Sequence, residues 1–572
     1  MSLLHQDFTI KFRLHSICGC HARAPVTDLL IRGATVIDGN GAPPVRADVV
    51  LDRGRIAAVV PEGTASESSA ERVLDAGGLV VAPGFIDMHS HADFTLPSYP
   101  GALNSLSQGV TTEVIGNCGY SPAPLAADKR LAEDQRQAGR GLGPDLDWAW
   151  HSFGEYLARL DAARPAVNCI ALVGHGMLRL AVVGAADRAA TVGELATMRD
   201  LAADALAQGA WGMSTGLVYP PGSFAATDEI VAVGAALTAV DGLYVSHIRN
   251  ENDGLAHALR EAVEIARRLG VRAQVSHLKA AGRSNHGRAA EALGILAEAR
   301  ASGVRVTQDA YPYTAGSTLL TQLVPPWVQD GGTDALVERL GSDEVRARIA
   351  ADIRHGLPGW PNYIVASGGW DAIRIAAVAD PALASLEGHT IARAAADRGM
   401  EPLGLVLDTM VADRGATTMI VSLMDEADVD LVLDDPSTAI GSDQLGVTTR
   451  HARVHPRSYG AFTRVLGRFV RERGRLDLTT AIHRMTGLPA SILGLEDRGR
   501  IVPGTIADLV IFDPVTVNDA STYDEPTALA VGVEAVLLGG RFAIDGGRAV
   551  DPRLGRVLRR EVSGPRRPHR SA

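Results

Sequence analysis

The sequence predicts an α/β protein: a (β/α)8 barrel of the TIM type, with a small β-sandwich domain built from both termini. Two observations support this prediction. Through the middle of the chain, eight short apolar runs of strand type alternate with helical stretches rich in Ala, Leu, Glu and Arg. Near both ends, short β-rich runs are broken by Gly, Asn and Pro and show no helical period.

The eight expected barrel strands follow one another along the chain. They are residues 79–91, 109–118, 168–175, 209–219, 242–248, 271–278, 304–310 and 437–443. Two of the helical stretches between them, 191–209 and 261–270, each end in a glycine directly before the next strand, as helix C-termini often do. These alternating elements predict strands connected by helices, which is the repeating unit of the barrel.

The barrel is assigned to residues 81–495, which is longer than the about 250 residues that such a barrel usually needs. Most of the additional residues lie between the seventh and eighth strands, at about 311–436, in a segment that contains stretches rich in Gly, Pro and Trp. Insertions at the catalytic end of a barrel commonly cover or shape the substrate site. We therefore expect this insertion to form part of the site.

The remaining residues are expected to form the second domain and two loose ends. Residues 26–80 and 496–560 are predicted to make the composite β domain. Residues 1–25 are predicted to be a loose extension and residues 561–572 a disordered tail. Cys18 and Cys20 have no second cysteine pair nearby, so they are not taken as a metal site.

Composition excludes several classes of protein. The chain has 572 residues, with 46% hydrophobic and 21% charged, as in an ordinary globular protein. Its 55 basic and 66 acidic residues give a formal charge of −11, which argues against a nucleic-acid partner. No apolar run approaches the ~20 residues that span a bilayer, so no membrane partner is expected. Four cysteines are too few for a disulfide framework and favour a cytoplasmic location.

Metal-capable side chains lie at the ends of the expected strands. They are His89, His91, Cys118, His247, His277 and Asp443. The carboxyl ends of barrel strands meet at one mouth, so these side chains should converge. A single strand histidine is usually structural, but His89 and His91 share one face because side chains alternate along a strand. Since zinc prefers nitrogen and sulfur ligands, the pattern predicts a metallohydrolase.

Other candidate residues have an ordinary structural explanation beside the functional one. Asp443 could take a proton from water bound to a metal, although an aspartate after a strand is also a common helix cap. Asp309 has the same two interpretations, and capping is favoured there. Arg457 follows the eighth strand. It could form a bidentate pair with a carboxylate, or it could be a surface arginine. Tyr219 could line the barrel mouth or be a packed aromatic residue of the surface. Lys279 could line the mouth or be a solvated lysine.

Longer motifs point to one known family. They are PGFIDMHSHAD, LSQGVTTEVIGNCGYSPAP, MSTGLVYPPG, YVSHIRNE, VSHLKAAG, DAYPYTAGST, AIGSD, HPRSYGAFTRVLGRFVRE and MTGLPASILGLEDRGRIVPGTIADLVIFDP. Through them the chain resembles the N-acyl-D-amino-acid deacylase (D-aminoacylase) family of the amidohydrolase superfamily, from about residue 27 to about residue 545. The resemblance implies zinc-dependent hydrolysis of a small N-acyl-D-amino acid to a carboxylate and a free D-amino acid.

The resemblance also implies a role for each candidate residue. The tightly bound zinc would be held by Cys118, His247 and His277. A second, weaker metal position would be formed by His89, His91 and Asp443. Asp443 would act as general base and then general acid on the metal-bound water. Arg457 and Tyr219 would bind the α-carboxylate of the substrate. Lys279 would line the substrate site.

One departure from the family pattern concerns substrate preference. The family has a glycine after the catalytic aspartate, whereas this chain has Gln444. A larger polar side chain there is expected to narrow the pocket or to hydrogen-bond the substrate. An acidic substrate would need a cation beyond Arg457, such as Lys279. We expect a neutral or hydrophobic side chain on the D-amino acid.

Two alternative functions remain open from the sequence. The first is another amidohydrolase reaction, the opening of a cyclic amide as in hydantoinases or dihydroorotases. Such sites typically bridge two metals through a carboxylated lysine on the fourth strand, and the fourth run here, GMSTGLVY, has no lysine. The second is a barrel that serves as a scaffold without catalysis. The presence of all six ligands argues against it.

Overall fold

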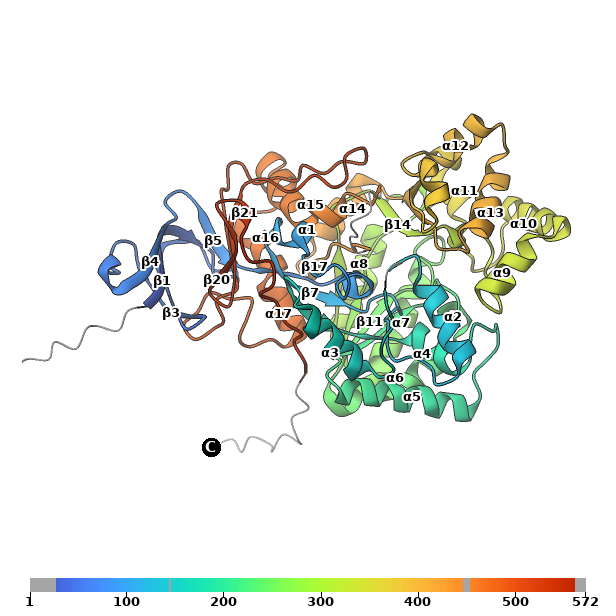
Figure 1. Ribbon diagram of the computed structural model, residues 1–572, viewed down its shortest axis with the longest axis horizontal. Helices are drawn as coiled ribbons and strands as arrows, with labels where there is room; N and C mark the ends of the chain where they lie inside the picture. The colour runs from blue at the N-terminus through green and yellow to red at the C-terminus, as the bar shows by residue number, and fades with distance from the viewer. Residues whose placement is uncertain (1–26, 144–145, 446–452, 561–572) are drawn as a thin grey trace, which may run out of the picture.

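A computed structural model describes residues 27–143, 146–445 and 453–560. The predicted extension (1–25), with Cys18 and Cys20, and the predicted tail (561–572) lie outside the described residues. Figure 1 shows a helix-covered barrel, with a β-rich body on one side and a group of helices, α9 to α13, on the other. Within the described residues, no helix combines the length and apolar character that crossing a membrane requires.

The barrel predicted from the sequence is confirmed. Its strands are β6 (Phe85–Asp87), β7 (Val110–Ile115), β8 (Asn168–Ala171), β9 (Val173–Gly174), β10 (Gly212–Gly216), β11 (Leu243–His247), β12 (Arg272–Val275), β13 (Val306–Ala310) and β17 (Thr438–Ile440). They pair in parallel as β6-β7-β8 and as β9-β10-β11-β12-β13-β17. The pieces β8 and β9 are one run interrupted at Leu172. Met88 N lies 3.5 Å from Ile440 O, which joins the first strand to the last.

Helices cover the outside of the barrel. They include α3 (Phe153–Ala163), α4 (His175–Val182), α5 (Val192–Ala207), α6 (Thr227–Gly234), α7 (Leu255–Leu269), α8 (Ala289–Ala301) and α14 (Glu426–Asp434). In α7 the buried residues recur every three or four positions, so one face packs inward. Capping boxes begin α3 and α5, through Ser152 and Thr191, and their side chains satisfy amides that the helices leave unpaired.

Both ends of the chain contribute strands to one sheet. Among the described residues it has nine strands: β1 (Thr27–Val36), β2 (Val45–Asp52), β3 (Arg55–Pro61), β4 (Ala70–Asp75), β5 (Val80–Pro83), β18 (Leu509–Phe512), β19 (Val533–Leu538), β20 (Arg541–Asp545) and β21 (Arg548–Ala549). The antiparallel pair β5 and β18 joins the two ends. Residues such as Ile31, Val49 and Ile511 share one apolar core. We propose that these strands form the composite domain.

The first expected strand, 79–91, is two strands in the structure. β5 belongs to the composite sheet and β6 belongs to the barrel. Gly84 separates them, and a Cβ at this position would lie 2.3 Å from the Thr111 side chain. The chain therefore passes from one sheet to the other at a point where only glycine fits, and an unbroken apolar run does not reveal that change.

The expected insertion lies between β13 and β17, the last two barrel strands. Its strands β14 (Ala315–Leu319), β15 (Ile373–Ala377) and β16 (Thr418–Ser422) form an antiparallel sheet in the order β14-β16-β15. Its helices are α9 (Thr333–Leu340), α10 (Asp343–His355), α11 (Tyr363–Ser367), α12 (Ile391–Arg398) and α13 (Pro402–Ala412). In Figure 1 these helices project from the barrel, and β14 lies on the barrel side of them.

In the part of the chain that the structure describes, five other helices follow the first two barrel strands or the last one. They are α1 (Leu103–Leu106), α2 (Lys129–Gly139), α15 (Arg457–Arg464), α16 (Leu478–Met485) and α17 (Gly487–Leu493). Helix α1 packs against α15 and β7. This contact packs the segment after β6 against the segment after β17.

Candidate metal centre

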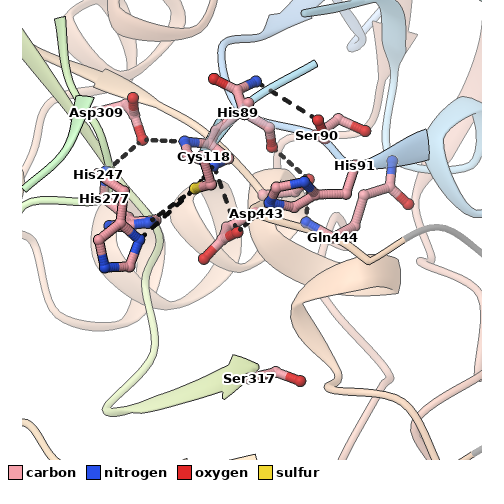
Figure 2. Close-up of polar contacts among 12 residues, drawn as sticks. His89, Ser90, His91, Cys118, His247, His277, Asp309, Ser317, Asp443 and Gln444 are labelled. Atoms are coloured by element: carbon pink, nitrogen blue, oxygen red, sulfur yellow. Dashed lines mark hydrogen bonds and ion pairs between the residues drawn. The ribbon is translucent and has the colours of Figure 1, made fainter. Parts of the chain in front are cut away.

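The six predicted ligands converge at the carboxyl ends of the barrel strands (Figure 2). They are His89 and His91 after β6, Cys118 after β7, His247 at the end of β11, His277 after β12 and Asp443 after β17. All six are buried. Residues up to 354 positions apart in the sequence thus meet at one point, as parallel strands in a closed barrel require.

The spacing of the ligand atoms fits a tetrahedral metal. Cys118 Sγ lies 3.3 Å from His89 Nε2, 3.5 Å from His277 Nε2 and 3.7 Å from His247 Nδ1. Zinc bonds of about 2.0–2.3 Å at tetrahedral angles separate neighbouring ligand atoms by about 3.3–3.8 Å. The three distances from Sγ lie in that range and are compatible with zinc bound by Cys118 and these histidines.

Cys118 is common to two of the three possible ligand groups. These groups are His89, His91 and Cys118; Cys118, His247 and His277; and His89, His277 and Asp443, each with its ligand atoms within 4.8 Å of one another. Burial raises the pKa of a thiol, but the charges of His89 and His277 outweigh it and hold the pKa of Cys118 well below its usual value. The thiolate that a metal requires is therefore favoured.

Three of these residues have strained backbones. Cys118, His277 and Asp443 have φ values of +54°, +32° and +51°. Residues with side chains rarely adopt this region, and such strain tends to persist at functional sites. Beside Cys118, a Cβ on Gly119 would lie 2.7 Å from Gly216 N, so the turn packs tightly against β10. The strained turns aim all three side chains into the barrel mouth.

Glu251 is a functional candidate that the sequence analysis missed. This buried carboxylate lies 3.0 Å from His277 Nδ1 and 3.7 Å from His247 Nε2, and 2.6 Å from Lys279 Nζ. The two histidines turn their other ring nitrogens toward Cys118. A carboxylate behind metal-binding histidines fixes the tautomer and the ring orientation. The available signal was an acid four residues after His247 in SHIRNE.

Asp309 is not a helix cap, so the favoured interpretation was wrong. It lies within β13 and is buried, and its side chain accepts hydrogen bonds from His277 N at 2.8 Å and Gln274 Nε2 at 3.0 Å. Its Oδ1 lies 3.3 Å from His89 Nδ1. Asp309 therefore supports His89 from behind, as Glu251 supports the other two histidines.

Asp443 lies between the histidine pair and an arginine. Its Oδ1 is 3.5 Å from His89 Nε2 and 3.4 Å from His91 Nε2, and its Oδ2 is 2.8 Å from Arg457 Nη1. Burial opposes ionisation of this carboxyl, but the charge of Arg457 outweighs it and holds the pKa of Asp443 well below its usual value. Asp443 is therefore held as an anion.

Arg457 lies behind Asp443 rather than among the described residues that line the cavity. Its guanidinium stacks 4.7 Å from the Tyr311 ring and donates to Ser317 O at 3.3 Å. Its exposed fraction is 0%. The predicted carboxylate-binding arginine is thus already paired with Asp443, and it contributes its positive charge from beneath the site.

The ligands open into a cavity with two walls. Tyr219 and Lys279 lie on the barrel side, where the Tyr219 ring packs 4.8 Å from that of His247 and its hydroxyl accepts a hydrogen bond from Thr318 Oγ1 at 3.2 Å. The opposite wall comes from β14 and β16 of the insertion. Figure 2 shows Ser317 of β14 across the cavity from the metal-capable residues. The insertion therefore shapes the site.

Gln444 points away from the cavity, so the expectation that it narrows the pocket was wrong. Its amide nitrogen donates to Ser105 Oγ and Glu113 Oε1, each at 3.1 Å. Its amide oxygen accepts from Asn104 Nδ2 at 2.6 Å. These partners lie on α1 and β7, so Gln444 ties the segment after β17 to its neighbours instead of contacting substrate.

Replacing Gln444 by glycine is expected to reduce stability and leave substrate preference unchanged. The change removes buried hydrogen bonds and leaves Glu113 and Asn104 with fewer partners, at a cost of about 1–3 kcal/mol. Denaturant unfolding measures the loss, and kcat/KM for two substrates measures preference. Gln208→Gly, outside this network, is the control for removing a glutamine. A shift of more than about tenfold in the substrate ratio, far above what a distant substitution produces, would mean that Gln444 reaches the substrate.

Comparisons with known proteins agree with this geometry. The model of the Amidohydrolase family matches residues 72–544. N-acyl-D-aspartate deacylase and D-aminoacylase of Alcaligenes xylosoxydans xylosoxydans are 39% and 38% identical, over 93% and 94% of this chain and 95% and 98% of theirs. The crystal structure of N-acyl-D-glutamate deacylase from Bordetella bronchiseptica, complexed with zinc and a phosphonate inhibitor, has a TM-score of 0.78 and 36% identity and covers 94% of this chain and all of its own.

Proposed function

This chain belongs to the amidohydrolase family, and we propose that its buried ligands and Asp443 carry out zinc-dependent hydrolysis of N-acyl-D-amino acids. The products are a carboxylate and a free D-amino acid. The observation that carries the proposal is the set of ligand distances around Cys118, which match a tetrahedral metal.

We assign the ligands to two metal positions. Cys118, His247 and His277 would hold the firmly bound zinc, because Glu251 lies behind both histidines, 3.0 Å from His277 Nδ1 and 3.7 Å from His247 Nε2. His89, His91 and Asp443 would form a second, weaker position that shares Cys118. Bound zinc supplies a Lewis acid that polarises the scissile carbonyl and lowers the pKa of water.

The protein's own residues would move the proton and hold the substrate. Asp443 accepts the proton of the attacking water and returns it to the leaving nitrogen. Arg457 keeps Asp443 ionised and in place. We propose that Tyr219 and Arg457 bind the α-carboxylate, with Lys279 at the same wall; because Arg457 is buried and paired with Asp443, it would act on the substrate through its charge. Tyr219 lines the cavity, and Arg457 lies directly behind it, next to Ser317 O.

A screen of paired enantiomers tests this function. N-acetyl-D- and N-acetyl-L-amino acids are incubated with the protein, with added zinc and with a chelator, and release of free amino acid is measured. We expect turnover of D-substrates that the chelator abolishes. Turnover of cyclic amides alone would favour the cyclic amidase instead, and absence of both activities from zinc-loaded protein would favour the scaffold.

Glu251→Gln is expected to weaken zinc binding about 10–100-fold. The amide has nearly the same shape but carries no charge, so it holds the two histidines less firmly. Competition with a chromogenic chelator measures the affinity independently of activity. Glu264→Gln, on the exposed face of α7, is the matched control. Zinc affinity equal to that of the unmodified protein would remove Glu251 from the metal site.

A cytoplasmic location is part of the proposal. Cys118 and Cys169 are free cysteines. A metal-binding thiolate at Cys118 requires a compartment in which thiols remain reduced.

A further inference from the structure

We propose that the preferred substrate has a neutral, apolar side chain on its D-amino acid, and that the protein discriminates against D-aspartate and D-glutamate derivatives. This inference rests on the proposed function. Overall similarity does not decide the matter, because the compared relatives named for different substrates are 39%, 38% and 36% identical to this chain. The chemistry of the cavity wall does.

Five aliphatic side chains line the cavity, beside the polar Ser317 and Thr318 of β14. They are Leu142, Leu319, Val421, Leu423 and Leu445. Leu319 lies on β14 and Val421 on β16, two paired strands of the insertion. Leu319 and Leu445 are only partly buried, so part of each side chain borders the open cavity. A substrate side chain that projects away from the metal would contact these leucines.

The positive charges that the structure describes near the cavity are already paired. Among the described residues that line it, Lys279 is the one Lys or Arg, and its Nζ lies 2.6 Å from Glu251. Arg457, behind the wall, is paired with Asp443 at 2.8 Å. The substrate's α-carboxylate also has to be matched by these two cations.

A second carboxylate would therefore meet leucines and, among the residues that the structure describes, no unpaired cation. Burying an unpaired charge against apolar surface is costly. The nearby carboxylates Glu251 and Asp443 add repulsion. An apolar side chain suffers neither penalty, and it gains by leaving water.

The direct test compares kcat/KM for N-acetyl-D-leucine, N-acetyl-D-methionine, N-acetyl-D-aspartate and N-acetyl-D-glutamate on zinc-loaded protein. We expect the apolar substrates to be favoured by about 100-fold or more. Equal or faster hydrolysis of an acidic substrate would overturn the inference and leave the proposed function intact. Failure to hydrolyse any of the four would count against the proposed function itself.

Two variants locate the discrimination on this wall. Leu319→Arg supplies a cation and should raise the glutamate-to-leucine ratio of kcat/KM by about tenfold or more. Leu431→Arg adds the same charge at an exposed position on α14 and should leave the ratio unchanged. Should the arginine prevent folding, Leu319→Ala should lower kcat/KM for N-acetyl-D-leucine more than for N-acetyl-D-alanine. Unchanged ratios in zinc-loaded Leu319 variants would refute the assignment.

Discussion

Replacing Asp443 by asparagine is expected to lower kcat by about 10³-fold while one equivalent of zinc stays bound, since general acid–base groups typically contribute 10²–10⁴-fold. The amide cannot accept the proton of water or return one to the leaving nitrogen. Zinc should remain because Cys118, His247 and His277 are unchanged. Steady-state kinetics and metal analysis of the same sample measure both quantities.

The control for Asp443→Asn is Asp371→Asn, an exposed acid of the insertion. It should have normal kcat and normal zinc content. Near-normal turnover in Asp443→Asn would exclude Asp443 as the proton carrier. Complete loss of zinc would instead make Asp443 chiefly a ligand, and the proton would then have to move through another group.

Replacing Cys118 by alanine is expected to abolish activity through loss of zinc. Its thiolate belongs to two of the ligand groups, so its removal weakens both metal positions at once. The fall in zinc affinity should exceed the decrease of about 10–100-fold that is expected when Glu251, which contacts a ligand but not the metal, is replaced. Metal analysis after dialysis against a chelator, followed by assay without added zinc, measures the effect.

Cys169→Ala is the matched control for Cys118→Ala. Cys169 is equally buried, but it lies in β8, and its thiol points to Val167 O at 3.6 Å. This variant should lose some stability through the cavity it leaves and should keep its zinc. A Cys118→Ala protein that retains zinc like the control would show that the histidines hold the metal without the thiolate.

The sequence predicted the barrel, and the convergence of the six candidate ligands, because both depend on local patterns. Apolar runs and glycine-ended helices repeat along the chain and reveal the strand count. His89 and His91 share a face through the two-residue period of a strand, and the other ligands each follow an apolar run. Since parallel barrel strands all end at one mouth, strand-end position alone predicts that these residues meet.

Supporting residues were predicted poorly because their roles depend on distant partners. Asp309 carries no local pattern, and the one signal for Glu251 is its position four residues after His247. Their contacts with His89 and His277 join distant parts of the chain. Gln444 differs from the family's glycine beside a catalytic aspartate, which suggested a pocket residue. Only the neighbouring α1 and β7 show that its amide has buried partners elsewhere.

The sequence by itself thus determined the fold class and which six candidate ligands lie at strand ends, because periodicity and strand-end position are local properties. The tertiary structure decided which groups hold those ligands, that Arg457 is paired with Asp443, and that the cavity faces a leucine wall from the insertion. Those properties arise from side chains far apart in the chain. Their directions and charges are set only when the barrel closes and the insertion packs over its mouth.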